Sequence, residues 1–168
     1  MATVQFGNTS ADMRLVDEFY GIAALRNFVV YLDNFVSERE QIVSQTPTQI
    51  VIREFNAANE SIVLSATGTI PWGPLSELAI EALGIRETAN GTIFIAPDGS
   101  PYGTVTAASA VNIADGSLIA RASGINLPLD DAYFAVDANV LAGNDTVTSG
   151  SGNDYLLGYA GADTLSSD

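Results

Sequence analysis

The 168-residue sequence contains no cysteine, no histidine and no lysine. Without cysteine, neither a disulfide framework nor a thiolate zinc site can form. Without histidine, the Ser-His-Asp and Cys-His triads, imidazole metal ligands and the commonest general base near neutral pH are all excluded. No hydroxyl nucleophile therefore has an imidazole to activate it. We assign no catalytic residue and no organic cofactor site, and we expect a chain that is not itself an enzyme.

Positive charge is also scarce, since six arginines face twenty Asp and Glu for a formal net charge of -14. Such a surface repels nucleic acid and anionic membranes, so we expect no nucleic-acid partner. Hard cations are suitable partners, because carboxylate oxygens are the ligands that calcium prefers. The last basic residue is Arg121, and residues 122–168 carry seven aspartates with no countercharge.

Long apolar runs are missing as well. No run of about eighteen apolar residues is free of charge, so membrane insertion is not expected. The opening MATVQFGNTS lacks the basic stretch and apolar segment of a signal peptide, so export would require another signal. The sequence also stops within a repeat, which suggests a piece of a longer chain.

The first half of the sequence mixes helical and strand patterns. Apolar residues at three- and four-residue steps predict a helix over residues 15–36, although FVVYL (28–32) also suits a buried strand. The β-rich runs 48–55 and 61–70 are joined by NAANE, which favours a hairpin. Pro74 opens PLSELAIEAL (74–83), and Gly84 stands where a C-cap would fall, so we predict a short helix there. Further strands are expected at residues 91–96, 102–108, 117–125 and 131–137.

From Val140 the sequence falls into three nine-residue units: unit one (140–148), unit two (149–157) and unit three (158–166). Three columns recur every nine residues: Gly143, Gly152 and Gly161; Asp145, Asp154 and Asp163; and the aliphatics Val147, Leu156 and Leu165. Strict recurrence at a short period is typical of a solenoid.

These units resemble the RTX, or hemolysin-type, calcium-binding repeat, whose pattern is Gly-Gly-x-Gly-x-Asp-x-aliphatic-x. The two leading glycine columns depart from the pattern, reading Val140, Ser149 and Gly158, and Leu141, Gly150 and Tyr159. Strain there should weaken calcium binding relative to an ideal repeat. The resemblance implies calcium as cofactor, a parallel β-roll, and a bacterial protein exported by type I secretion to the cell surface or outside. The implied metal-site residues are Gly143, Asn144, Asp145, Gly152, Asn153, Asp154, Gly161, Ala162 and Asp163.

In such a roll, successive loops alternate sides, so the ligands of one ion come from units two apart. Asp145 and Asp163 would then form the only complete site, and Asp154 would need a following repeat. Ordering nine residues costs more conformational entropy than one buried aliphatic returns, so the units should fold only when calcium binds. The alternative is a disordered acidic tail that binds no specific ion.

The expected fold class is α+β: a strand-dominated N-terminal domain (1–138) followed by the start of a parallel β-roll (139–168). PTQIVIRE, DGSPYGTVT and ASGINLPL resemble uncharacterised β-rich modules that precede RTX repeats. We expect a structural or adhesive calcium-binding module whose partners are calcium and a cell-surface polysaccharide or protein. The alternatives are part of an exported hydrolase, such as one that acts on polysaccharides, or a small-ligand or sugar-binding module that uses Trp72 and Tyr102.

Overall fold

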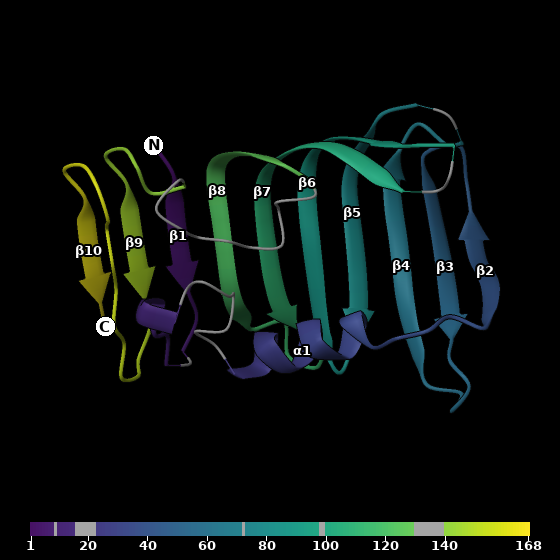
Figure 1. Ribbon diagram of the computed structural model, residues 1–168, viewed down its shortest axis with the longest axis horizontal. Helices are drawn as coiled ribbons and strands as arrows, with labels where there is room; N and C mark the ends of the chain where they lie inside the picture. The colour runs from purple at the N-terminus through teal and green to yellow at the C-terminus, as the bar shows by residue number, and fades with distance from the viewer. Residues whose placement is uncertain (9, 16–22, 72, 98–99, 130–139) are drawn as a thin grey trace.

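Within the residues that the structure describes, the computed structural model is one ten-stranded sheet with an α-helix across one face (Figure 1). The described residues are 1–8, 10–15, 23–71, 73–97, 100–129 and 140–168. The strands are β1 (Thr3–Phe6), β2 (Arg39–Gln45), β3 (Gln49–Phe55), β4 (Ser61–Gly68), β5 (Leu75–Ala82), β6 (Ile85–Ile95), β7 (Pro101–Asn112), β8 (Leu118–Pro128), β9 (Thr146–Ser149) and β10 (Thr164–Ser167). The helices are the 3-10 turn η1 (Met13–Leu15) and α1 (Ala23–Asp33).

The sheet has two parts with different strand directions. Strands β2 to β8 form an antiparallel meander in which each strand pairs with the next along the chain. Strand β1 then lies between β8 and β9, antiparallel to the first and parallel to the second, and β10 continues the parallel part. Both ends of the chain therefore join one sheet, while the expected domain boundary at 138/139 lies outside the described residues.

Most of the predicted strands are confirmed. The hairpin through NAANE joins β3 to β4, and the other confirmed strands correspond to β6, β7 and β8. The helix predicted over 15–36 is confirmed over Ala23–Asp33 as α1, while Leu15 belongs to η1, residues 16–22 lie outside the described part of the chain and residues 34–36 are not helical. The strand expected at 131–137 also lies outside it.

The short helix predicted over 74–83 is wrong, because this segment is strand β5. Its apolar residues fit helical steps, but β4 and β6 pair with both of its edges, and this pairing overrides local propensity. Leu83 and Gly84 have φ values of 50° and 78° and form a two-residue hairpin turn. Positive φ at both central residues is typical of the type I′ turn that joins twisted strands. Gly84 thus has the positive φ that a helix C-cap also needs, but it lies in the turn of the β5–β6 hairpin.

The apolar core lies on the face of the sheet that α1 covers. Leu25 and Phe28 of α1 are buried against a cluster that includes Ile85, Ala110 and Ile119. A second cluster extends from the central strands to β1 and β9, where Val4 and Val147 are almost fully buried. Buried apolar contact therefore runs from the meander into the first repeat unit. No described helix is long and apolar enough to cross a membrane.

Glu87 of β6 is an acidic residue on an apolar part of the sheet. Its cross-strand neighbours are Ile80 and the fully buried Ala110. Burial raises the pKa of Glu87 from its ordinary value of 4.5 to about 7. The folded protein therefore holds a proton here at pH values where the unfolded chain has released it.

This pKa predicts a fall in stability between pH 5.5 and pH 8. The proton stabilises the folded state fully below pH 4.5, and this stabilisation is lost as the pH rises through about 7. Replacing Glu87 with Gln should remove about 1 to 2 kcal/mol of that decrease, allowing for partial solvent exposure. Urea unfolding of both proteins at pH 5.5 and pH 8, with calcium held constant, measures this change in the free energy of unfolding. Glu40→Gln on the exposed strand β2 is the control, and identical pH profiles for Glu87→Gln and the parent would contradict the prediction.

Candidate metal centre

Units one and three are direct neighbours in the sheet. Their strands, β9 and β10, pair in parallel with Thr146 opposite Thr164 and Ser149 opposite Ser167. Paired residues are eighteen positions apart, which is two repeat lengths. Units one and three, which are two units apart, therefore lie side by side in the sheet.

Hydrogen bonds from backbone N–H groups to side-chain oxygens join the loops of these two units. The Asp145 N–H donates to Asp163 Oδ1 at 2.8 Å, and the Ala162 N–H donates to Asn144 Oδ1 at 2.9 Å. The backbones also approach closely, because a Cβ on Gly161 would lie 1.7 Å from the Gly143 carbonyl oxygen. Six of the nine predicted site residues, 143–145 and 161–163, are therefore brought together.

Asp145 is the most enclosed of the repeat aspartates, with 3% of its surface exposed. Its Oδ1 accepts a hydrogen bond from the Ala2 N–H at 2.6 Å, and its Oδ2 accepts one from the Gly143 N–H at 3.1 Å. Two backbone donors thus fix the orientation of this carboxylate. The contact with Ala2 was not foreseen from the sequence.

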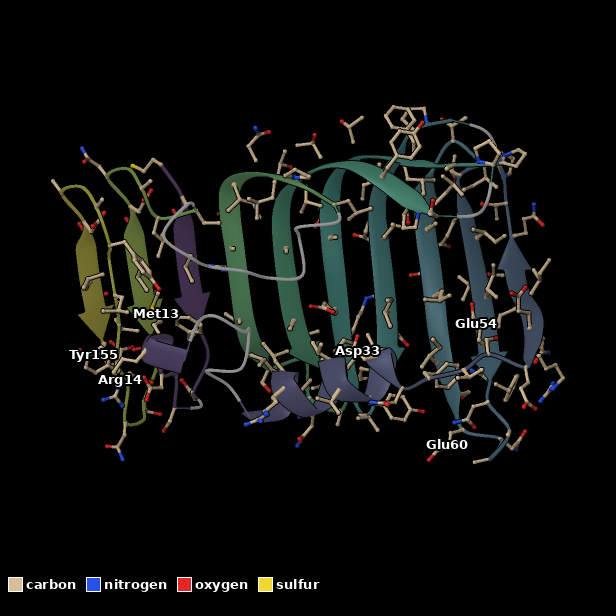
Figure 2. All side chains as sticks on the ribbon, in the orientation of Figure 1. Met13, Arg14, Asp33, Glu54, Glu60 and Tyr155 are labelled. Carbon is tan, nitrogen blue, oxygen red and sulfur yellow. The ribbon has the colours of Figure 1, made fainter. Side chains whose placement is uncertain are left out.

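Unit two contacts a different part of the chain. Asp154 Oδ1 accepts a hydrogen bond from the Ala11 N–H at 2.8 Å, and the Asn153 N–H donates to Ser10 Oγ at 3.1 Å. Arg14 packs its guanidinium over the Tyr155 ring, and Figure 2 shows Met13, Arg14 and Tyr155 gathered at this end of the sheet. Gly152, Asn153 and Asp154 therefore lie against Ser10 and Ala11.

The repeat units offer a hard cation carboxylate and backbone carbonyl oxygens. Asp154 Oδ2 is buried and has no hydrogen-bond partner among the described groups, and such an oxygen is costly unless a cation or donor satisfies it. The described residues contain no group of three or more Asp, Glu, His or Cys placed to hold a metal. Calcium takes six to eight oxygen ligands, so backbone carbonyls would have to complete any sphere begun by Asp145 and Asp163.

Two residues that replace glycine in the second column, Leu141 and Tyr159, have different effects on the structure. Tyr159 adopts a φ of 60°, in the left-handed region that costs a residue with a Cβ, so the expected strain is confirmed at this position. Leu141, in the same column of unit one, is fully buried in the cluster with Val4 and Val147. Leu141 thus contributes an apolar side chain to the core that glycine would not supply.

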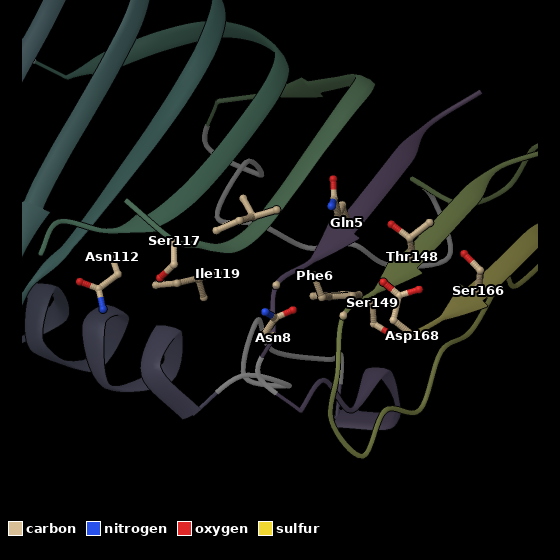
Figure 3. A pocket seen from close by; sticks show the side chains of 13 residues that line it. Gln5, Phe6, Asn8, Asn112, Ser117, Ile119, Thr148, Ser149, Ser166 and Asp168 are labelled. Carbon is tan, nitrogen blue, oxygen red and sulfur yellow. The ribbon is translucent and has the colours of Figure 1, made fainter. Parts of the chain in front are cut away.

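A pocket of about 530 Å³ opens where β1, β9 and β10 end beside β8 (Figure 3). Its polar lining includes Asn8, Thr148 and Ser149, and its one carboxylate comes from Asp168. Among the described residues, this pocket therefore lacks the pair of facing carboxylates that glycoside hydrolysis uses.

Two aromatic residues were considered for ligand binding, and the described one, Tyr102, does not line this pocket. Trp72 is outside the described residues. Tyr102 is 52% exposed and stacks on Phe94, with 5.5 Å between the ring centroids.

Residues 140–168 match the family model described as "RTX calcium-binding nonapeptide repeat (4 copies)". No curated protein and no solved structure matches the chain. The resemblance seen in the repeat columns is therefore confirmed for these 29 residues.

Proposed function

Because residues 140–168 are an RTX calcium-binding repeat tract, we propose that this chain is a calcium-folded module of a secreted or cell-surface protein. We propose a structural or adhesive role for it, with a cell-surface polysaccharide or protein as the partner beyond calcium. The stacking of Asp145 on Asp163 is the observation that carries the proposal. RTX nonapeptide repeats bind calcium, so the cofactor is calcium.

The ligands we assign come from the two stacked units. Asp145 and Asp163 supply the charged oxygens, and carbonyl groups of the flanking loops 142–144 and 160–162 supply neutral ones. Gly161 allows the Gly143 carbonyl to approach unit three. Calcium supplies the positive charge that relieves the repulsion among these aspartates, since no basic residue follows Arg121.

Asp163→Asn tests this assignment. Asparagine keeps an oxygen that can accept the Asp145 N–H, but it removes the charge that calcium requires. We expect calcium affinity to fall by at least the roughly 10- to 100-fold that loss of an outer-shell metal partner costs. The parent should bind in the class of extracellular modules, with a Kd of about 10⁻⁴ to 10⁻³ M. Calorimetric titration followed by circular dichroism measures both quantities.

The matched control is Asp33→Asn at the exposed end of α1, which removes the same charge away from the repeats. It should leave the calcium titration unchanged. A parent protein that shows no calcium-dependent heat and no gain of β signal would overturn the proposed function. So would an Asp163→Asn variant that binds calcium as the parent does.

A further inference from the structure

The segment from Ala2 to Met13 does not follow the RTX pattern, yet it runs beside units one and two at a constant offset. Thr3 pairs in parallel with Thr146, and Asp12 forms a parallel bridge with Tyr155. Both pairs are 143 residues apart, as are the pairs Ala2–Asp145, Ser10–Asn153 and Ala11–Asp154, which are joined by hydrogen bonds. The described backbone of this segment therefore follows the same path as the repeat units.

Two of the hydrogen bonds that join unit one to unit three also occur between the N-terminal segment and unit one. Between the units, the Asp145 N–H donates to Asp163 Oδ1 at 2.8 Å and the Thr164 N–H donates to the Asp145 carbonyl at 2.8 Å. In the same way, the Ala2 N–H donates to Asp145 Oδ1 at 2.6 Å and the Thr146 N–H donates to the Ala2 carbonyl at 3.1 Å. Ala2 thus occupies the place that an aspartate has in a repeat.

The same two bonds occur a third time on unit two. The Ala11 N–H donates to Asp154 Oδ1 at 2.8 Å, and the Tyr155 N–H donates to the Ala11 carbonyl at 2.8 Å. Ala2 and Ala11 are nine residues apart, which is the repeat length. The segment therefore has two aspartate positions, and both hold alanine.

The aliphatic column is present in this segment too. Val4 and Met13 are also nine residues apart, and only 1% and 3% of their surfaces are exposed. Val4 pairs with Val147, and both Val4 and Met13 belong to the apolar cluster against which Leu156 packs. The segment thus keeps the core positions of a repeat and lacks the carboxylates that would bind calcium.

We propose that residues 2–13 are the first coil of the β-roll, a coil without calcium ligands onto which units one and two dock when calcium binds. This inference rests on the proposed calcium-dependent folding of the tract. Strand β1 is held on its other edge by β8, from Thr3 opposite Ser123 to Phe6 opposite Ala120. The first coil can therefore stay in place without calcium and offer a template to the units.

Residue-resolved amide exchange on the whole chain tests the docking. The amides of Ala2, Ala11 and Met13 donate to groups of units one and two, so calcium should slow their exchange by about tenfold or more relative to EDTA. The Gly7 amide is the internal control, because it donates to the Ile119 carbonyl at 2.9 Å within the sheet. Its exchange should change little.

The outcomes separate this inference from the proposed function. If calcium orders residues 140–168 and the three amides do not respond, the inference is overturned while the proposed function stands. Equal protection of these amides in EDTA and in calcium would also overturn it. A chain that binds no calcium by calorimetry would overturn the proposed function itself.

Ala2→Asp offers an independent test, because it restores the missing carboxylate beside Asp145 in the geometry that Asp145 has beside Asp163. We expect one additional calcium ion per chain by calorimetry or equilibrium dialysis. Thr3→Asp adds the same charge at the next, exposed position and should add none. A folded Ala2→Asp protein that binds no more calcium than Thr3→Asp would overturn the inference. If Ala2→Asp does not fold, the amide measurement decides.

Discussion

Chelation of calcium is expected to unfold residues 140–168 while strands β3 to β7 stay folded. The tract contributes two strands of four residues each, and every residue of β10 is exposed. Its four aspartates have no basic residue near them in sequence to offset their repulsion. By contrast, β3 to β7 are each paired along both edges. Hydrogen exchange with mass spectrometry, in calcium and in EDTA, should show that EDTA removes protection from the tract and from the amides of residues 2–13 that donate to it, while β3 to β7 keep theirs.

The control for this experiment is magnesium at matched ionic strength. Magnesium demands a small octahedral site and releases its water reluctantly, so it should not restore protection. Equal exchange of the tract in calcium and EDTA would contradict the prediction. Loss of protection throughout β3 to β7 would also contradict it, because the meander would then depend on the ion.

Gly161→Ala is expected to separate unit three from unit one. Its Cβ would lie 1.7 Å from the Gly143 carbonyl oxygen, and Gly161 has a φ of 136° that residues with a Cβ rarely adopt. The clash is with backbone, which a rotamer change cannot relieve. Strain of this kind costs about 2 kcal/mol or more, which corresponds to a roughly 30-fold weaker apparent calcium affinity. Calcium titration by calorimetry measures the change.

Gly116→Ala provides the matched control. Gly116 also has a positive φ, of 70°, but nothing lies within 4 Å of the position of its Cβ. This substitution should cost only the conformational strain of about 1 kcal/mol in urea unfolding. It should leave calcium binding unchanged. If Gly161→Ala binds calcium as tightly as Gly116→Ala, the close approach of units one and three is not required for the site.

The repeat tract could be predicted because each column has a recognisable role: glycine permits the turn, aspartate supplies a carboxylate and the aliphatic residue is buried. Asp145 and Asp163 recur two units apart, and their stacking follows from the alternation of loops in a roll. The first coil could not be predicted, since Ala2 and Ala11 carry no signature of a metal ligand. Their nine-residue spacing is visible in the sequence, but two alanines at this distance are unremarkable without the glycine columns. Only the pairing of β1 with β9 gives the spacing a meaning.

The meander was predictable where turn residues marked the ends of strands, as between β3 and β4. It was not predictable at β5, where Leu75, Leu78, Ala79 and Ala82 satisfy a helical period. The decisive interactions there are the pairings with β4 and β6, which join residues up to eighteen positions apart and which the periodicity of the segment itself does not reveal. Strand β1 was missed because four residues are too few for a periodic signal.

The parallel register of β9 and β10 also has a consequence for length. Each full coil uses eighteen residues and adds one strand to this side of the sheet. Neighbouring strands lie about 4.8 Å apart, so any further coil would extend the molecule by that amount in the same direction. The number of repeats would then set the distance between the last repeat and the meander. Calcium would determine whether the repeats hold that distance as a rigid structure.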